Sequence, residues 1–168
     1  MTTKQIKFDI QKFALNGSFK SNEPSGHYYM VIWSATQSIT GNYSDVTAKV
    51  YARPAYDVSC DGGGTLTLDG TVYHFYNQGL LRAAQSKLLL TVTKRLSHSV
   101  TGYKKLNMSI YASAGSLPNE DMINYSGSAS WDLNTIYRYA KFTSHYIVAT
   151  TLNTITVGWN TDVPANNE

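Results

Sequence analysis

The stretch DVTAKVYAR, residues 45–53, decides the fold, because its apolar and polar side chains alternate one by one. Successive side chains of a β-strand point to opposite faces of the sheet, so this period predicts a strand with one buried face. The same alternation returns in KKLNMSIYAS, residues 104–113, and in residues 88–92. The predicted core residues are Val46, Ala48, Val50, Ala52, Leu88, Leu90, Val92, Leu106, Met108, Ile110 and Ala112.

Turn signals separate the predicted strands. Asp69-Gly70 lies between two alternating runs, and both residue types tolerate the positive φ of a two-residue hairpin turn. Residues 27–37 are apolar on both faces, as in a central or doubly covered strand. Residues 128–133 give a last strand, and residues 79–86 have room for one turn of helix. About seven short strands with regular turns predict an all-β fold, an antiparallel β-sandwich with immunoglobulin-like or jelly-roll topology.

The sequence divides into four segments by its pattern. Ile6, Phe8 and Ile10 alternate near the start, whereas a stretch rich in aromatic and basic residues follows residue 134. We expect an N-terminal arm or edge strand over residues 1–20, a β-sandwich domain over 21–134, a linker over 135–149 and the start of a second sandwich-like module over 150–168. The first strand of that second module is expected to have no partner in the rest of the chain.

Composition limits the classes of function. The chain has 13 tyrosines and only 15% charged residues, against about 25% in average globular proteins. Its net charge of +3 comes with scattered basic residues, so no nucleic-acid-binding surface is predicted. Cys60 is the single cysteine and has no Cys or His at zinc spacing. The sequence lacks a signal-peptide h-region and a long apolar run, so we expect neither Sec export nor membrane insertion.

Sequence motifs of catalysis and metal binding do not occur. Glu120 and Asp121 are the clustered acids, in one loop, whereas a glycosidase needs two carboxylates about 5–10 Å apart. The four histidines lack metal-binding spacing; we expect His74 to be half-buried in a sheet and His98 to hydrogen-bond backbone in a Ser-His-Ser turn. Residues 61–64 are expected to form a flexible loop, not a phosphate-binding one. We predict no catalytic residue, no cofactor and no metal.

Tyrosine is the residue type that suggests binding, because phenol rings stack on sugar faces and carry a polar tip. Alternate loops of antiparallel strands meet at one end, and the loops over residues 56–64, 77–86 and 114–125 are longer than those at the other end. Binding usually resides in long loops on a rigid scaffold. The candidate ligand-binding residues are Tyr56, Asp61, Asn77, Arg82, Asn119 and Tyr125.

Several stretches resemble a family of minor structural proteins associated with the tails of siphophages that infect Gram-positive bacteria. They are the W-S-x-T-Q-S-I-x-x-N-x-S-x-V pattern (Trp33–Val46), LDGTVYHF (Leu68–Phe75), SHSVTGYKKL (Ser97–Leu106) and LNTIYR (Leu133–Arg138). Separately, FDIQKFA (Phe8–Ala14) resembles an opening seen in many structural proteins of tailed phages of Gram-positive bacteria. The likeness covers about two-thirds of the chain, over residues 29–137. The family, whose function is unknown, tends to carry Asp before the glycine of the histidine turn, where this chain has Thr101.

The resemblance implies a virion structural protein of a bacteriophage tail, in the tail tip, fibre or baseplate, made in the host cytoplasm. Its partners would be further copies of the chain, as in trimeric fibres, neighbouring virion proteins and bacterial cell-wall polysaccharide, without nucleic acid. Non-catalytic assembly and host-surface attachment form the leading hypothesis. A dedicated cell-wall carbohydrate-binding module is the alternative, and a glycan-degrading enzyme is the third.

Overall fold

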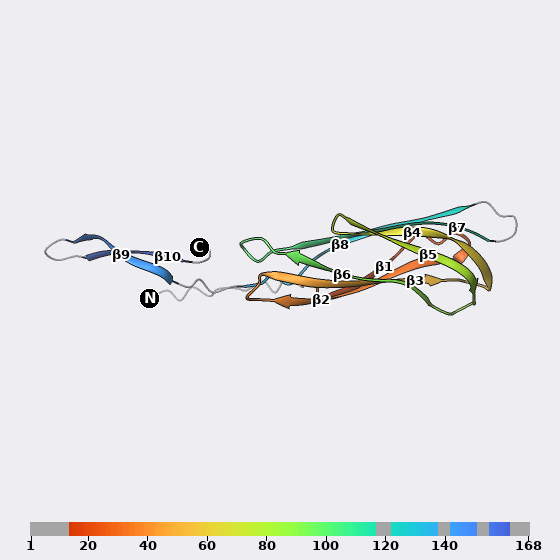
Figure 1. The fold of residues 1–168 in the computed structure, drawn as a ribbon, viewed down its shortest axis with the longest axis horizontal. Coiled ribbons are helices and arrows are strands. Elements are labelled where there is room, and N and C mark those ends of the chain that lie inside the picture. The colour runs from red at the N-terminus through yellow and green to blue at the C-terminus, as the bar shows by residue number, and fades with distance from the viewer. Residues whose placement is uncertain (1–13, 117–121, 138–141, 151–154, 162–168) are drawn as a thin grey trace, which may run out of the picture.

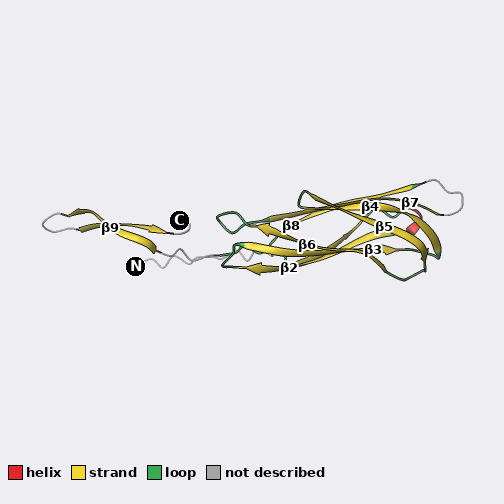
Figure 2. Cartoon of the chain, in the orientation of Figure 1, coloured by secondary structure: helices red, strands yellow, loops and turns green. Residues whose placement is uncertain are grey.

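The protein is built of antiparallel β-strands, as Figures 1 and 2 show. The computed structural model describes residues 14–116, 122–137, 142–150 and 155–161. One sheet contains, in spatial order, β1 (Asn16–Lys20), β2 (Tyr28–Ser38), β3 (Tyr43–Arg53) and β6 (Lys87–Ser97). The other contains β5 (Thr71–Leu81), β4 (Val58–Leu68), β7 (Lys105–Ser116) and β8 (Ile123–Asp132). The predicted all-β sandwich is confirmed.

The division of the strands is four and four. The jelly roll also has eight strands in two sheets, whereas the immunoglobulin constant domain has seven, divided four and three.

The helical part of the described chain is one short 3-10 turn, Pro24–Gly26, and no helix there has the length and apolarity to cross a membrane.

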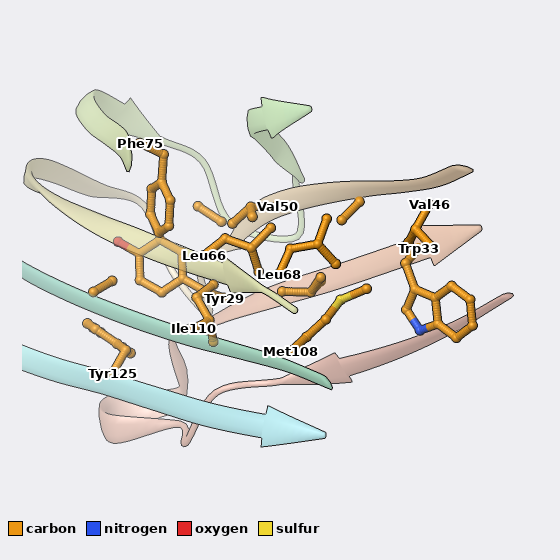
Figure 3. Close-up of a cluster of buried hydrophobic side chains, with 14 of the residues drawn as sticks. Tyr29, Trp33, Val46, Val50, Leu66, Leu68, Phe75, Met108, Ile110 and Tyr125 are labelled. Atoms are coloured by element: carbon orange, nitrogen blue, oxygen red, sulfur yellow. The ribbon is translucent and has the colours of Figure 1, made fainter. Parts of the chain in front are cut away.

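The hydrophobic core lies between the two sheets (Figure 3). Val46 and Val50 of β3 face Leu66 and Leu68 of β4 across the interior, and all four side chains are fully buried. The alternation of β3 and β7 is confirmed by the burial of Val46, Ala48, Val50, Ala52, Leu106, Met108, Ile110 and Ala112. Asp69 and Gly70 both have positive φ in the tight turn that joins β4 to β5, as predicted.

The glycine run at residues 61–64 is part of β4, so the prediction of a flexible loop is wrong. Gly62 and Gly64 stand on the inner face, where the backbone of β7 comes close. A Cβ atom on Gly62 would lie 2.3 Å from the Ser113 carbonyl oxygen, and one on Gly64 would lie 2.4 Å from that of Tyr111. Glycine is therefore used here for close approach within a sheet, and not for a loop.

Three further expectations need correction. Leu88 is exposed, because a β-bulge between Val50 and Tyr51 shifts the register and turns Leu88 to the outer face of β6. His74 is exposed rather than half-buried, on the outer face of β5. Residues 79–86 form no helix: Gly79–Leu81 completes β5, and a turn follows.

β2 is central in its sheet but is covered on one face only. Tyr29, Val31 and Trp33 point into the core, whereas Ile32 on the other face is 40% exposed. The predicted central position of this strand is therefore confirmed. The alternative, a strand covered on both faces, does not hold.

The first and last described strands differ in part from the four predicted segments. β1 is an edge strand of the sandwich, one of the two alternatives for residues 1–20; residues 1–13 lie outside the described part. Beyond the sandwich, β9 (Phe142–Thr150) pairs antiparallel with β10 (Ile155–Thr161). The predicted linker over 135–149 thus contains a strand, and the strand after residue 150 has a partner. A second module stays a prediction.

Candidate functional site

A cavity of about 90 Å³ opens between the two sheets, where β3 leads into β4. Both sheets contribute to its wall, which includes the ends of β3, β5 and β7 and the starts of β2, β4 and β8. Three of the six predicted residues, Tyr56, Asn77 and Tyr125, line this one cavity. The end of the sandwich with the longer predicted loops is therefore also the end with the cavity.

Aromatic rings form much of the wall. The Tyr29 ring packs edge to face on Tyr125, with centroids 5.1 Å apart, and lies 5.7 Å from the Phe75 ring behind it. Figure 3 shows these three rings gathered at one end of the core. Tyr56 is 53% exposed at the rim, where it meets His27 edge to face at 4.3 Å. The rings give the cavity an apolar surface with polar tips.

Asn77 places an amide inside this apolar wall. Its side chain is 1% exposed, and Nδ2 donates hydrogen bonds to Tyr29 Oη at 3.3 Å and to Cys60 Sγ at 3.4 Å. Its Oδ1 is buried and has no hydrogen-bond partner among the residues that the structure describes. A buried acceptor left unpaired costs about 1–3 kcal/mol, so such atoms usually meet water or a ligand.

Two buried donors accompany this acceptor. Nδ1 of His27 accepts a hydrogen bond from the Ala55 backbone N–H at 3.3 Å, so the neutral ring carries its proton on Nε2. His27 and Arg53 both line this cavity. His27 Nε2 and Arg53 Nε are buried and have no hydrogen-bond partner among the described residues. Three residues of the cavity wall therefore each hold one buried polar atom without a described partner: two N–H donors and one carbonyl acceptor.

Burial sets the protonation of the lining. It raises the pKa of Tyr29 to about 12 and raises the pKa of the Cys60 thiol, so both groups stay protonated at neutral pH. Burial also lowers the pKa of His27 from 6.5. Arg53 is then the charged member of the described lining, and it forms no ion pair with the described acidic residues.

The lowered pKa of His27 makes stability depend on pH. The unfolded chain binds a proton on His27 at about pH 6.5 and the folded chain only at lower pH, so the stabilisation is complete above pH 6.5 and is lost as the pH falls through the folded pKa. Protonation also removes the acceptor used by Ala55. We expect the free energy of unfolding to fall from pH 7.5 to 5.5 by more in the wild type than in His27→Gln, measured by urea denaturation. Equal falls would contradict this assignment.

The other predicted residues lie elsewhere. Asp61 is exposed on β4, where its Oδ1 accepts a hydrogen bond from Gln78 at 3.2 Å. Arg82 is paired with Asp57 at 3.5 Å beside a neighbouring hollow. Asn119 lies outside the described residues. The sequence reasoning missed His27 and Arg53, which only the folding of β2 and β3 brings to the cavity. The one available signal was a basic residue, Arg53, at the end of a predicted strand.

A second polar cluster is structural. The hydroxyl of Ser44 lies 2.7 Å from His98 Nε2, as in a nucleophile and base pair, but both side chains are buried. His98 Nδ1 lies 2.6 Å from the Gly102 carbonyl oxygen, which confirms the predicted bond to backbone. Gln37 also donates to Ser44, at 3.3 Å, and to the Asn134 carbonyl oxygen, at 2.6 Å. The cluster therefore connects the turn at residues 98–102 with Asn134, in the segment that follows the last strand of the sandwich.

No group of three or more His, Cys, Asp or Glu side chains in the described part of the chain is placed to hold a metal ion. Comparisons with protein-family models, with curated proteins and with solved structures found no match to the chain.

Proposed function

We propose that this chain is a non-catalytic structural module of a bacteriophage tail that helps the particle attach to polysaccharide on a Gram-positive surface. The observation that carries the binding role is the cavity at the end of the sandwich, whose lining includes aromatic rings and three residues that each hold a buried polar atom without a described partner. The viral origin rests on the sequence resemblance over residues 29–137.

The size of the cavity selects the kind of ligand. Sites that enclose a drug-sized ligand measure about 300–1,000 Å³, whereas this cavity has about 90 Å³. It can take one substituent of a sugar, such as a hydroxymethyl or acetamido group, while the ring of that sugar stacks at the rim on Tyr56. Sugar hydroxyls and amides both donate and accept, which matches Asn77 Oδ1 and the N–H groups of His27 and Arg53.

The lining favours binding over hydrolysis. Glycoside hydrolysis uses two carboxylates on either side of the bond that breaks. Neither Asp nor Glu is among the described residues that line the cavity. This supports the attachment hypothesis over the glycan-degrading enzyme.

The position of the cavity suits presentation to a surface. The sandwich begins beside the point where it ends, because Ala14 N–H donates to the Asp132 carbonyl oxygen at 3.1 Å and Ala14 forms a bridge with Leu133. That end is opposite the cavity, since β8 runs from the cavity at Ile123 to Asp132. A particle holding many copies by this end would point many cavities outward, and weak contacts would add up to firm attachment.

Two substitutions test the role of the cavity. Tyr56→Ala removes the ring at the rim, and Arg53→Met keeps the aliphatic stem but removes a donor and the charge. We expect each to weaken binding to Gram-positive cell walls about tenfold, which corresponds to one stacking contact or one hydrogen bond. Tyr137→Ala is the matched control, because Tyr137 is 76% exposed and lies past the sandwich.

The measurement is co-sedimentation with cell walls and with the same walls stripped of polysaccharide, at an oligomeric state fixed by light scattering. The proposal expects binding only to intact walls. Equal binding by both cavity variants and the wild type would contradict it, and a stable oligomer that binds neither preparation would leave assembly as the better function. Tight binding by a monomer would favour the dedicated carbohydrate-binding module.

A further inference from the structure

The outer face of the β5-β4-β7-β8 sheet is a second surface with a distinct composition. It lies on the opposite side of this sheet from the core and the end cavity. Its middle rows contain no charged residue; Asp61, Lys105 and Asp132 stand only toward its ends. Hydroxyl side chains from three adjacent strands cover the centre: Thr65, Thr67, Ser109, Ser113, Ser126 and Ser128.

Two tyrosines stand among these hydroxyls. Tyr76 of β5 is 75% exposed and Tyr111 of β7 is 51% exposed, values high for rings of this size. Tyr76 is paired with Gly63, and a Cβ atom on Gly63 would lie 3.4 Å from Tyr76 Cδ1, so the ring lies beside the bare glycine backbone. Tyr111 Oη donates to Asn124 Oδ1 at 3.0 Å, which holds that ring toward β8.

The same face is hollowed over β4, β7 and β8, and the hollow begins at Ser109, two residues along β7 from Tyr111. A shallow hollow of about 520 Å³ is lined by Thr67, Asn107, Ser109, Ser128 and Ser130, with Gly70 at its edge. Every polar group in this list is a neutral hydroxyl or amide. Such groups donate and accept hydrogen bonds with equal ease, as do the hydroxyls of a sugar.

We propose that this outer face is a binding platform for a neutral polysaccharide chain, independent of the end cavity. Tyr76 and Tyr111 stand on strands separated by β4, about 10 Å apart across the sheet, so two sugar rings of one extended chain can stack at once. The hydroxyls between them bond the rest of the chain. A charged polymer is disfavoured, because its ions would lose hydration over a surface with no opposite charge. A protein partner is disfavoured by the polar centre, since interface centres are apolar.

The test uses the full chain and soluble neutral polysaccharides released from Gram-positive walls, together with the same chains after carboxymethylation. Binding is followed by affinity electrophoresis of the wild type, Tyr76→Ala, Tyr111→Ala and the double variant. Both tyrosines are exposed, so the variants should fold, which circular dichroism checks. We expect each single change to weaken binding about tenfold and the double change to leave only the binding that the end cavity provides. Carboxymethylation should weaken binding by the wild type.

The controls separate this platform from the cavity. Tyr137→Ala should bind neutral chains like the wild type, while Tyr76→Ala should keep most of its binding to a short oligosaccharide that only the cavity can hold. The proposal is overturned if the double variant binds as well as the wild type, if no released neutral chain binds, or if Arg53→Met alone abolishes binding. Capture of a protein by this face, lost in the double variant, would also overturn it.

Discussion

Gly64→Ala should lower the free energy of unfolding by about 3 kcal/mol or more, at the upper end of the usual cost of overpacking. The added Cβ would lie 2.4 Å from the Tyr111 carbonyl oxygen, 2.5 Å from Phe75 Cζ and 2.8 Å from Ala112 Cβ. The Tyr111 backbone cannot move away without breaking the hydrogen bonds that pair β4 with β7. A domain with about 5–15 kcal/mol of total stability would lose a large part of it, and thermal melting should occur about 10 °C lower.

Gly63→Ala is the matched control in the same strand. Gly63 faces outward, and its added Cβ would lie 3.1 Å from the Phe75 carbonyl oxygen with no closer contact. We expect this variant to lose much less stability than Gly64→Ala, because the Phe75 carbonyl has to give by only a few tenths of an ångström. If the two alanine variants melted together, β4 would not have the described inner and outer faces.

Trp33→Ala should lower the free energy of unfolding by about 3–5 kcal/mol, because it removes the largest fully buried side chain of the core and leaves a cavity. Trp33 is 1% exposed, and its ring lies 5.1 Å from that of Trp131 on the facing sheet. It fills the end of the core away from Tyr29, as Figure 3 shows. The change should be measured by equilibrium urea denaturation with circular dichroism.

Trp33→Phe separates volume from hydrogen bonding. Trp33 Nε1 is buried and has no partner in the described part of the chain, so phenylalanine gives up no hydrogen bond there. We expect it to cost less than half as much as alanine, with the cavity term as the main loss. Equal costs for the two variants would show that the indole N–H, and not the ring volume, stabilises this end of the core.

The fold follows from local patterns in the sequence where one face of a strand is buried. β3 and β7 alternate without interruption, and Asp69-Gly70 carries the turn chemistry of a tight hairpin. Prediction failed where tertiary contacts override the pattern. The glycines of β4 suggest a loop until the proximity of β7 is known, and the bulge opposite Val50 moves Leu88 outward without any signal in its own residues.

The sequence predicted the end of the sandwich where the candidate site lies, but not all of the residues that line it. Alternating strand directions located the end of the sandwich that contains the cavity, and Tyr56, Asn77 and Tyr125 meet there. Asn77 and Tyr125 stand on strands and not on the predicted loops, because β5 and β8 extend further than their alternation indicated. His27 and Arg53 come from segments that appear only structural in the sequence, and their unsatisfied N–H groups are a property of packing.

The measurement that tests the central claim most directly is an NMR titration of the isotope-labelled protein with polysaccharide released from Gram-positive walls. If the end cavity recognises a sugar substituent, the Asn77 side-chain amide, His27 Nε2 and the Arg53 Nε–H signals should shift together and saturate at one affinity. A saturable titration that leaves these three signals unmoved, or no binding by a folded protein, would contradict the proposed attachment site.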